Sequence, residues 1–365
     1  MRDGAPGTCD NLCHPLRARW SRRSLRCLSR HATVNAAHPL ATATADPAPS
    51  ALAPTPEGAA PASGATAPAL VSAPPASLLL EGGPHAVMLI HGLNSTPLEM
   101  RFVAKVLHKA GFTVLCPAVP GYSMGGPCTD RAQWIAALLR EYDALAARCT
   151  SVSVGGLCIG AALSLAVARE RPGVNALVLL SITLQYDGWA LPWYNFILEP
   201  CYRLGIGHNF AYQERTPFGL KNEALRKRIS ESMRASRQSA VGSAEIPIAF
   251  LYQAIRLGRE VRAALPRIAT DTLIMHAVDD ETASPRNAHT VFNEIAAEHK
   301  RKLMLGDSYH VICMDNEREL VARETVRFIF ASLARRQLID ATGRKLPSTS
   351  RALMRTLRRG AAHAA

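Results

Sequence analysis

The sequence predicts an α/β fold in which helices flank a mostly parallel sheet. From about residue 77 to residue 335, short apolar runs alternate with longer segments whose apolar residues recur at helical spacing. A turn bounded by Gly156 and Gly160 connects one of these runs to a helical segment, and a long aromatic-rich insertion separates two others. This alternation favours parallel strands joined by helices on both faces of a sheet.

The expected strands are short apolar runs, and the expected helices carry apolar residues three or four positions apart. We predict strands at Ala86–Ile90, Thr113–Cys116, Val152–Val154, Asn175–Ser181, Thr272–His276 and Lys302–Leu305. We predict helices at Pro97–Ala110, Arg131–Ala147, Ala161–Arg169, Arg286–Ala297 and Arg318–Leu333. Gly111, directly after the first of these helices, is a typical helix stop.

Residues 182–266 interrupt the alternation. They contain 11 of the 21 aromatic residues of the chain, a group that includes Trp189, Trp193, Tyr194, Phe196 and Tyr202. An insertion between two strands of an open sheet lies above the carboxyl edge, where such sheets bind ligands. We therefore predict a helical cap whose aromatic residues form its core and partly line an apolar pocket.

The net charge of +13 comes mostly from the ends of the chain. Residues 1–75 carry a net charge of +3, residues 335–365 carry +7, and residues 76–334 carry only +3. A nucleic-acid groove needs clustered Lys and Arg on the folded domain itself. We therefore expect no nucleic-acid partner.

The two ends of the chain do not have the composition of a packed core. Residues 1–76 are first Arg-rich and then mostly Ala, Pro, Ser, Thr and Gly, so we predict that they are disordered. Residues 336–365 are predicted to form a basic C-terminal tail. The folded domain should then span residues 77–335, with the cap at about 182–266.

The nine cysteines are irregularly spread and match neither a disulfide framework nor the paired spacing of a metal site. Reduced thiols in a cytoplasmic protein are the simplest interpretation, so we expect a cytoplasmic location and no metal or other cofactor. No stretch approaches 18 uninterrupted apolar residues, so we expect no transmembrane segment.

The turn Gly156-Leu157-Cys158-Ile159-Gly160 follows a predicted strand and opens a predicted helix. This strand–turn–helix context is that of a nucleophile elbow, here with cysteine at its centre. Glycine on each side relieves the crowding of such a strained turn. The turn would raise the Cys158 side chain above the sheet and direct the backbone amide of Ile159 toward a reacting carbonyl group. A buried structural cysteine is the alternative interpretation.

A candidate general base lies in the loop between the last predicted strand and the last predicted helix. Triads built on this elbow run along the chain in the order nucleophile, acid, base. His310 is the only histidine after Lys300, apart from His363 near the C-terminus. A solvated loop histidine is the alternative interpretation.

The acid is expected at the end of the strand Thr272–His276. Three adjacent carboxylates, those of Asp279, Asp280 and Glu281, follow this strand, and chemistry alone leaves the choice among them open. Only one is needed to orient His310 and to stabilise its imidazolium form.

With these motifs, residues 78–335 resemble the α/β-hydrolase superfamily, in particular small bacterial carboxylesterases and monoacylglycerol lipases. The motifs that match in order and spacing are the His-Gly loop at 91–92, the elbow at 156–160, and Ser308-Tyr309-His310-Val311-Ile312 with Asp315 behind it. In this group the catalytic aspartate lies five residues before a proline. The resemblance therefore assigns the acid to Asp280, five residues before Pro285, with Asp279 as the second choice.

The resemblance also implies an oxyanion hole. The loop His91-Gly92-Leu93-Asn94 directly follows the first predicted strand and resembles the oxyanion loop of the family. The backbone amide of Leu93 would pair with that of Ile159, and losing one such donor costs about 2.7–4 kcal/mol of transition-state stabilisation. We interpret His91 itself as a structural residue that braces the loop.

Cys158 departs from this resemblance, because most of these esterases carry serine in the elbow. Cysteine elbows occur in dienelactone hydrolases, which are short and lack a cap, and in polyhydroxyalkanoate synthases, which are much longer than this chain. The resemblance therefore implies the fold and the triad but not the substrate.

We expect hydrolysis of esters or thioesters with an apolar acyl group, through Cys158, Asp280 and His310. A thiol beside a histidine at a helix N-terminus is readily ionised at neutral pH. A thiolate leaves more easily than an alkoxide, so activated esters and thioesters are more plausible substrates than ordinary alkyl esters. The alternatives are an acyltransferase of the polyester-synthase type and a non-catalytic binding protein on the same fold.

Overall fold

A computed structural model describes residues 75–191, 197–206, 210–239 and 242–338. The segment 1–76 lies outside the described residues except for its last two, and the tail 336–365 lies outside except for its first three. Three aromatic residues of the expected cap also lie outside: Trp193, Tyr194 and Phe196.

Seven strands form the central sheet. They are β1 (Leu78–Leu80), β2 (His85–Ile90), β3 (Thr113–Cys116), β4 (Ser151–Leu157), β5 (Leu177–Leu180), β10 (Thr272–Ala277) and β11 (Lys300–Leu305). Their order across the sheet is β1-β3-β2-β4-β5-β10-β11. β1 is antiparallel to β3, and all other neighbours are parallel. Because β4 is the central strand, the turn at its carboxyl end lies between the ends of β2 and β5.

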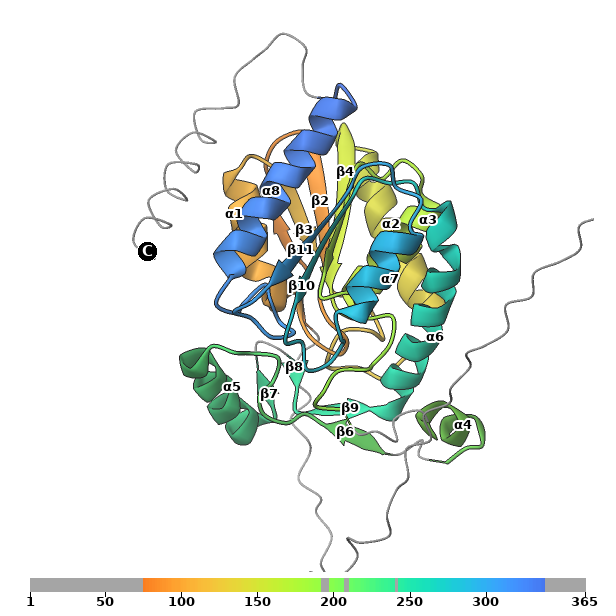
Figure 1. Cartoon of the computed structure of the whole chain (residues 1–365), viewed down its shortest axis with the longest axis vertical. Helices are drawn as coiled ribbons and strands as arrows, with labels where there is room; N and C mark the ends of the chain where they lie inside the picture. Colours follow the sequence, from red (N-terminus) through yellow and green to blue (C-terminus); the bar gives the residue numbers. More distant parts are fainter. Residues whose placement is uncertain (1–74, 192–196, 207–209, 240–241, 339–365) are drawn as a thin grey trace, which may run out of the picture. The chain divides into compact units, whose positions relative to one another are not determined.

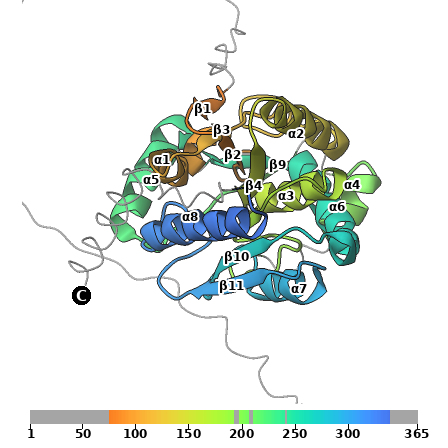
Figure 2. The same ribbon diagram turned by 90° about the horizontal axis from the view of Figure 1, so that it is seen from above.

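Helices cover both faces of this sheet. They are α1 (Arg101–Lys109), α2 (Arg131–Ala146), α3 (Ile159–Glu170), α6 (Ile248–Ala264), α7 (Arg286–Glu294) and α8 (Arg318–Arg335). α1 and α8 lie side by side on one face, and α2, α3, α6 and α7 lie on the other (Figures 1 and 2). Strands covered on both faces read as continuous apolar runs, and every residue of β3 and β5 is buried. The predicted α/β fold is confirmed.

Some element bounds differ from those predicted. The expected helix Pro97–Ala110 begins as a 3-10 helix, η1 (Pro97–Met100), before α1 follows. α7 ends at Glu294, three residues earlier than expected, because Ile295 has extended backbone angles (φ −72°, ψ 136°). The sequence analysis missed β1, whose three residues are too few to show a periodic pattern.

Between β5 and β10 the chain forms the insertion, most of which lies at one end of the sheet (Figure 1). It contains α4 (Leu198–Arg203) and α5 (Glu223–Ser236), together with β6 (Ala211–Gln213), β7 (Gln238–Ser239), β8 (Gly242–Ser243) and β9 (Glu245–Pro247). β6 pairs with β9 and β7 pairs with β8, both antiparallel. The insertion therefore contains helices, as expected of the cap, and also short strands that the sequence analysis did not predict, because strands of two or three residues are too short for an alternating pattern to reveal them.

The last helix of the insertion, α6, belongs to the helical layer on the sheet. It packs along α3, and its buried face includes Ala254, Leu257 and Val261. At Gly258 it passes so close to the chain after β5 that a Cβ atom there would lie 2.2 Å from the carbonyl oxygen of Leu184. This contact fixes the segment that follows β5.

A buried aromatic cluster joins α2, α6 and the loop that follows β2. The Trp134 ring lies 5.1 Å from that of Tyr122 and 6.3 Å from that of Phe250, and its Nε1–H donates to the Gly121 carbonyl oxygen at 2.9 Å. Tyr122 stacks on His91 with ring centroids 5.1 Å apart and donates its hydroxyl to the His91 carbonyl oxygen at 2.7 Å. The cluster thereby anchors the loop after β2 to the core.

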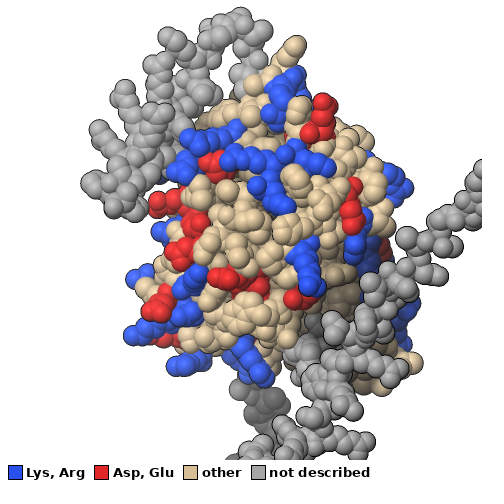
Figure 3. All heavy atoms as spheres, in the orientation of Figure 1, with Lys and Arg blue, Asp and Glu red and all other residues tan. Residues whose placement is uncertain are grey.

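On the face shown in Figure 3, basic and acidic side chains are interspersed. This distribution agrees with the nearly balanced charge of residues 76–334. Within the part of the chain that the structure describes, none of the helices combines the length and the apolar character needed to cross a bilayer.

Candidate active site

Cys158 occupies the turn between β4 and α3, at the carboxyl edge of the sheet. Its backbone angles, φ 58° and ψ −120°, are ones that L residues rarely adopt. A Cβ on Gly156 would lie 2.4 Å from the Gly160 carbonyl carbon, and a Cβ on Gly160 would lie 2.3 Å from the Ile90 carbonyl oxygen. Both positions therefore require glycine, and the turn has the strained backbone of a nucleophile elbow.

His310 and Asp280 form a buried hydrogen-bonded pair. The His310 Nδ1 atom lies 2.8 Å from one carboxylate oxygen of Asp280 and 2.9 Å from the other. The same carboxylate accepts the backbone N–H groups of Thr282 at 2.9 Å and Ala283 at 2.8 Å. With Nδ1–H donating to a carboxylate held in this way, the opposite ring nitrogen, Nε2, faces away from Asp280.

The charges of the pair support each other. Burial acts to raise the pKa of Asp280, but the neighbouring His310 overcomes this effect and holds that pKa below its usual value. Burial acts to lower the pKa of His310, but Asp280 and Cys158 together raise it well above 6.5. The site therefore favours the imidazolium form of His310 at neutral pH, which is the form produced when a thiol gives its proton to the ring.

Cys158 is the acidic group next to the free side of the imidazole. The His310 Nε2 atom is buried and has no hydrogen bond of ordinary geometry within the described residues, while the charge of Cys158 contributes to the raised pKa of His310. Cys158 is 8% exposed and His310 is 6% exposed. The structure thus brings together Cys158, His310 and Asp280, the three side chains that the sequence analysis singled out.

The other two carboxylates next to Asp280 have different partners. The Asp279 side chain is 57% exposed, and its carboxylate lies 3.5 Å from the Lys221 ammonium group. Glu281 is buried and accepts the backbone N–H of His310 at 3.1 Å. Of the three, only Asp280 contacts the imidazole ring.

Two backbone amides, one in the elbow and one in the loop after β2, lack an acceptor among the described residues. The N–H groups of Leu93 and Ile159 donate to no other residue in the described ranges. The N–H of Gly92, by contrast, donates to a carboxylate oxygen of Glu99 at 2.6 Å. Glu99 is 3% exposed, and burial raises its pKa to about 7 although the hydrogen bond from Gly92 opposes this shift. Glu99 thus holds the loop that carries the Leu93 amide.

His91 braces the same loop. Its Nδ1–H donates to the Gly92 carbonyl oxygen at 2.8 Å, and its Nε2 accepts the hydroxyl of Ser123 at 2.7 Å. Burial lowers the pKa of His91 to about 4, so the ring is neutral at neutral pH. These contacts support the structural interpretation of this histidine.

The loop that carries His310 is also attached to the insertion. The buried carboxylate of Asp315 accepts the backbone N–H groups of Tyr309 at 2.8 Å, Lys221 at 2.7 Å and Asn222 at 2.8 Å. Lys221 and Asn222 immediately precede α5. Asp315 therefore joins the loop that carries His310 to the segment that leads into α5.

The sequence analysis missed two residues at the site, Thr183 and Glu99. The Thr183 hydroxyl oxygen lies 3.4 Å from the sulfur of Cys158. The Glu99 carboxylate reaches back to Gly92 from the first turn of η1. An acidic residue in a first helical turn is too common a feature to reveal such a contact, and nothing local in the sequence distinguishes Thr183.

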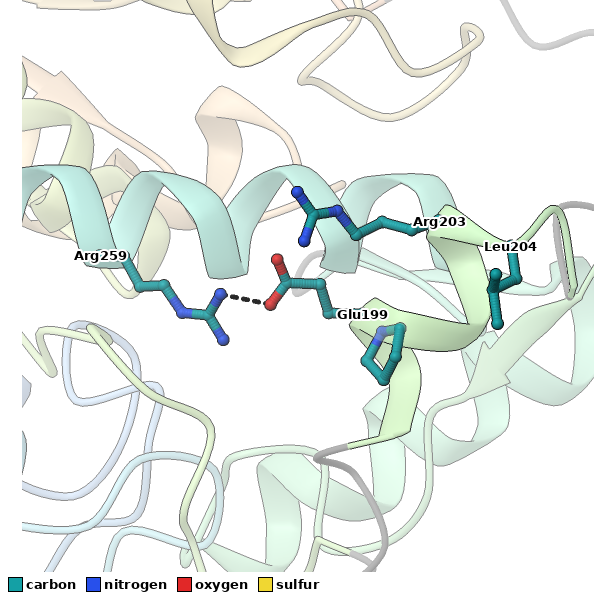
Figure 4. Close-up of a pocket in the computed structure, with 5 residues that line it drawn as sticks. Glu199, Arg203, Leu204 and Arg259 are labelled. Atoms are coloured by element: carbon teal, nitrogen blue, oxygen red, sulfur yellow. Dashed lines mark ion pairs between the residues drawn. The ribbon is translucent and has the colours of Figure 1, made fainter.

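A surface hollow lies elsewhere on the molecule. It is lined by Glu199, Pro200, Arg203, Leu204 and Arg259, and it contains the ion pair between Glu199 and Arg259 (Figure 4). None of the predicted site residues lines it. Among the described residues, no group of three or more His, Cys, Asp and Glu side chains is arranged to hold a metal ion.

Two characterised relatives match most of the domain. Over 251 residues the chain is 28% identical to a thermostable monoacylglycerol lipase from Bacillus sp. (strain H-257), covering 68% of this chain and 91% of that protein. Over 260 residues it is 21% identical to a carboxylesterase from Bacillus subtilis (strain 168), covering 70% and 96%. By name, both relatives are carboxylic ester hydrolases, the class of enzyme that the sequence predicts.

Solved structures share the fold at low identity. A monoacylglycerol lipase from Paleococcus ferrophilus superposes with a TM-score of 0.60 at 17% identity, covering 70% of this chain and 98% of that one. A soluble variant of monoglyceride lipase from Saccharomyces cerevisiae gives 0.59 at 12% identity, covering 70% and 90%. The family model described as serine aminopeptidase S33 matches residues 84–317, and the chain therefore belongs to this family of α/β-hydrolases.

Proposed function

We propose that the protein hydrolyses carboxylic esters or thioesters through an acyl intermediate on Cys158. The observation that carries this proposal is the contact of 2.8 Å between His310 and Asp280 beside a cysteine in a strained turn. The lipase and the carboxylesterase among the relatives support an acyl substrate of this kind. The triad is buried, so water competes little for its hydrogen bonds.

The surroundings of the sulfur favour an apolar acyl group. Tyr122 is buried and Tyr186 is half-buried, and both lie close enough to Cys158 that its charge helps, after burial itself, to raise the pKa of the two phenols. Both rings therefore remain neutral over the working pH range. A site with such walls accepts an acyl chain more readily than a charged one.

In the first half of the proposed reaction, Cys158 becomes acylated. The proton of the Cys158 thiol passes to Nε2 of His310. The resulting thiolate then attacks the carbonyl carbon, and the carbonyl π electrons move onto the oxygen. The amides of Leu93 and Ile159 donate to this oxyanion. The adduct then collapses: the carbonyl bond re-forms, the bond to the leaving alcohol or thiol breaks, and His310 returns the proton to that leaving group.

In the second half, water releases the acid. His310 takes a proton from a water molecule as its oxygen attacks the thioester carbonyl, and the same two amides hold the new oxyanion. Collapse breaks the bond from carbon to sulfur, and the imidazolium returns its proton to the departing Cys158. Asp280 keeps its charge throughout and stabilises the imidazolium in both halves.

The cysteine favours some substrates over others. In the first adduct two leaving groups compete, the Cys158 sulfur and the substrate's own alcohol or thiol. A thiolate leaves more easily than an alkoxide, so an adduct with an alkyl ester tends to revert. A thioester or an activated ester supplies a leaving group of comparable quality, so acylation proceeds.

Trapping the intermediate tests this proposal. The protein is mixed with a short-chain nitrophenyl ester and quenched in acid, and the peptide that contains Cys158 is weighed by mass spectrometry. We expect the mass of one added acyl group, absent in Cys158→Ala, which should also be inactive. Full activity in Cys158→Ala would overturn the proposal.

A second assay distinguishes hydrolysis from transfer. An acyl-CoA is supplied with and without an alcohol acceptor, and the products are separated. Free acid in both mixtures supports the hydrolase. Ester formed in place of acid would reassign the protein as an acyltransferase. If neither the acyl-CoA nor the nitrophenyl ester is turned over, the protein would be a binding protein.

A further inference from the structure

The buried position of Cys158 raises the question of what stabilises a charge on its sulfur. Only 8% of the residue is exposed, so water reaches it poorly. Burial disfavours a charged group unless donors from the protein replace the lost water. His310 supplies one such donor once it holds the proton.

The Thr183 hydroxyl is a second donor within reach. Its oxygen lies 3.4 Å from the Cys158 sulfur and 3.2 Å from the Ser181 carbonyl oxygen. A hydroxyl has one proton and donates to one acceptor at a time. Thr183 can therefore donate to the Ser181 carbonyl or to the sulfur, and the charged acceptor forms the stronger hydrogen bond.

The position of Thr183 is well fixed. Ser181 turns the chain after β5 with a positive φ of 43°, and its N–H donates to the Met275 carbonyl oxygen at 2.8 Å. The side-chain oxygen of Asn287 then accepts the N–H groups of Leu184 and Gln185, both at 2.9 Å. Thr183 itself is 1% exposed. A hydroxyl held between these two anchors loses little additional freedom when it binds the sulfur.

We propose that Thr183 is a catalytic hydrogen-bond donor to the sulfur of Cys158, one that stabilises the thiolate before attack and again when it is expelled. When the thiol proton passes to Nε2 of His310, the Thr183 O–H turns from the Ser181 carbonyl to the sulfur. No covalent bond of Thr183 changes. The proposal rests on the proposed function of Cys158.

The spacing suits cysteine rather than serine. Hydrogen bonds between two oxygens span about 2.5–3.0 Å, whereas the larger sulfur accepts at the observed 3.4 Å. A serine oxygen is smaller and sits on a shorter bond to Cβ. Thr183 is therefore expected to matter with cysteine in the elbow and to matter little with serine there.

The test follows alkylation of Cys158 by iodoacetamide as a function of pH, a readout that needs no turnover. Rates are measured on the full chain from the mass of the Cys158 peptide, for the native protein, Thr183→Val and Thr183→Ser. We expect the Thr183→Val profile to move to higher pH, with a rate at pH 7 about tenfold lower, as for a lost hydrogen bond to a charged group. Thr183→Ser keeps the hydroxyl and should retain the native profile.

Two controls separate this effect from damage to the fold. Thr325, whose hydroxyl donates to the Val321 carbonyl oxygen at 2.8 Å, is a buried threonine in α8, and Thr325→Val should leave the alkylation profile unchanged. If Thr183→Val does not fold, Thr183→Ala replaces it and must show the same displacement. Coincident profiles for the native protein and a folded variant without the hydroxyl would overturn the proposal.

A double-mutant comparison separates this inference from the proposed function. Thr183→Val should lower thioester hydrolysis about tenfold with Cys158 present and change ester hydrolysis less than about twofold in Cys158→Ser. Equal losses in both backgrounds would refute a role specific to the sulfur. If the alkylation profile of Thr183→Val is displaced but Cys158→Ala is active, the hydrogen bond is upheld and Cys158 is not the nucleophile. If the profile is not displaced but Cys158→Ala is inactive, Cys158 is upheld as the nucleophile and the hydrogen bond is refuted.

Discussion

The imidazole of His310 contacts Asp280 at 2.8 Å, whereas the adjacent Asp279 points to Lys221. Asp280→Asn should therefore lower kcat about a thousandfold or more, because an amide cannot stabilise the imidazolium and favours the wrong tautomer. Steady-state kinetics on a nitrophenyl ester provide the measurement, with circular dichroism to verify the fold.

Asp279→Asn is the matched control for that substitution. Its carboxylate is exposed, and among the described residues its side chain pairs with Lys221 alone, so kcat should change less than about threefold. Equal losses in the two variants, or the larger loss at Asp279, would transfer the role of the acid to Asp279.

Replacing the sulfur of Cys158 by an oxygen should change the preference among substrates. In Cys158→Ser the elbow side chain would leave the adduct as an alkoxide, which leaves no more easily than the alkoxide of the substrate. Alkyl esters should therefore be hydrolysed as fast as by the native protein or faster. The ratio of kcat/KM for a thioester to that for an alkyl ester with the same acyl chain should fall about tenfold, or about 1.4 kcal/mol in relative barrier. An unchanged ratio would show that the sulfur does not set the preference.

The buried Glu99 should make stability depend on pH. Burial raises its pKa from 4.5 to about 7 in the folded protein, although Gly92, His310 and Ser95 act to lower this pKa while Glu214 adds to the rise. A raised carboxyl pKa contributes stability below the unfolded value, and this contribution is lost as pH rises through the folded value. Between pH 5 and pH 8.5 the native protein should thus lose roughly 2–3 kcal/mol more than Glu99→Gln.

Urea unfolding at both pH values measures this difference. Gln keeps an oxygen to accept the Gly92 N–H but does not titrate, and the other buried groups titrate in both proteins. The same pH dependence in native protein and variant would show that Glu99 is already ionised at pH 5.

The N-terminal segment should be dispensable up to Ser77. The hydroxyl of Ser77 accepts the Ala118 N–H at 2.9 Å, and Leu78 begins the strand that pairs with β3. A chain that begins at Ser77 should keep full activity. A chain that begins at Glu81 also lacks β1 and its partly buried leucines, so it should be about 2–3 kcal/mol less stable. An inactive or insoluble protein beginning at Ser77 would contradict the prediction.

Much of the architecture could be predicted because its signals are local. Strands such as Thr113–Cys116 are buried on both faces and appear in the sequence as apolar runs. The elbow can be recognised from Gly156 and Gly160. The order nucleophile, acid, base then pointed to His310. The position of each side chain follows from the fold once these motifs are placed on the carboxyl edge of the sheet.

The remaining features depend on contacts between distant segments. Thr183 reaches Cys158 only because β5 lies next to β4 in the sheet, and Glu99 reaches Gly92 only because η1 turns back on the loop before it. The ribbon of β6 and β9 is held by pairing across more than thirty residues, as between Ala211 and Pro247. No periodic pattern in a single segment encodes such pairings.

Asp315 anchors the loop that carries His310, and this has a consequence for how the insertion can vary among related proteins. Its carboxylate holds the chain on both sides, at Tyr309 and at Lys221–Asn222, so the attachment ends where α5 begins. A change in length between α5 and α6 would leave these hydrogen bonds of Asp315 in place. Proteins that share this aspartate could therefore differ in the segment between α5 and α6, and in the acyl groups that they accept, while His310 keeps its position.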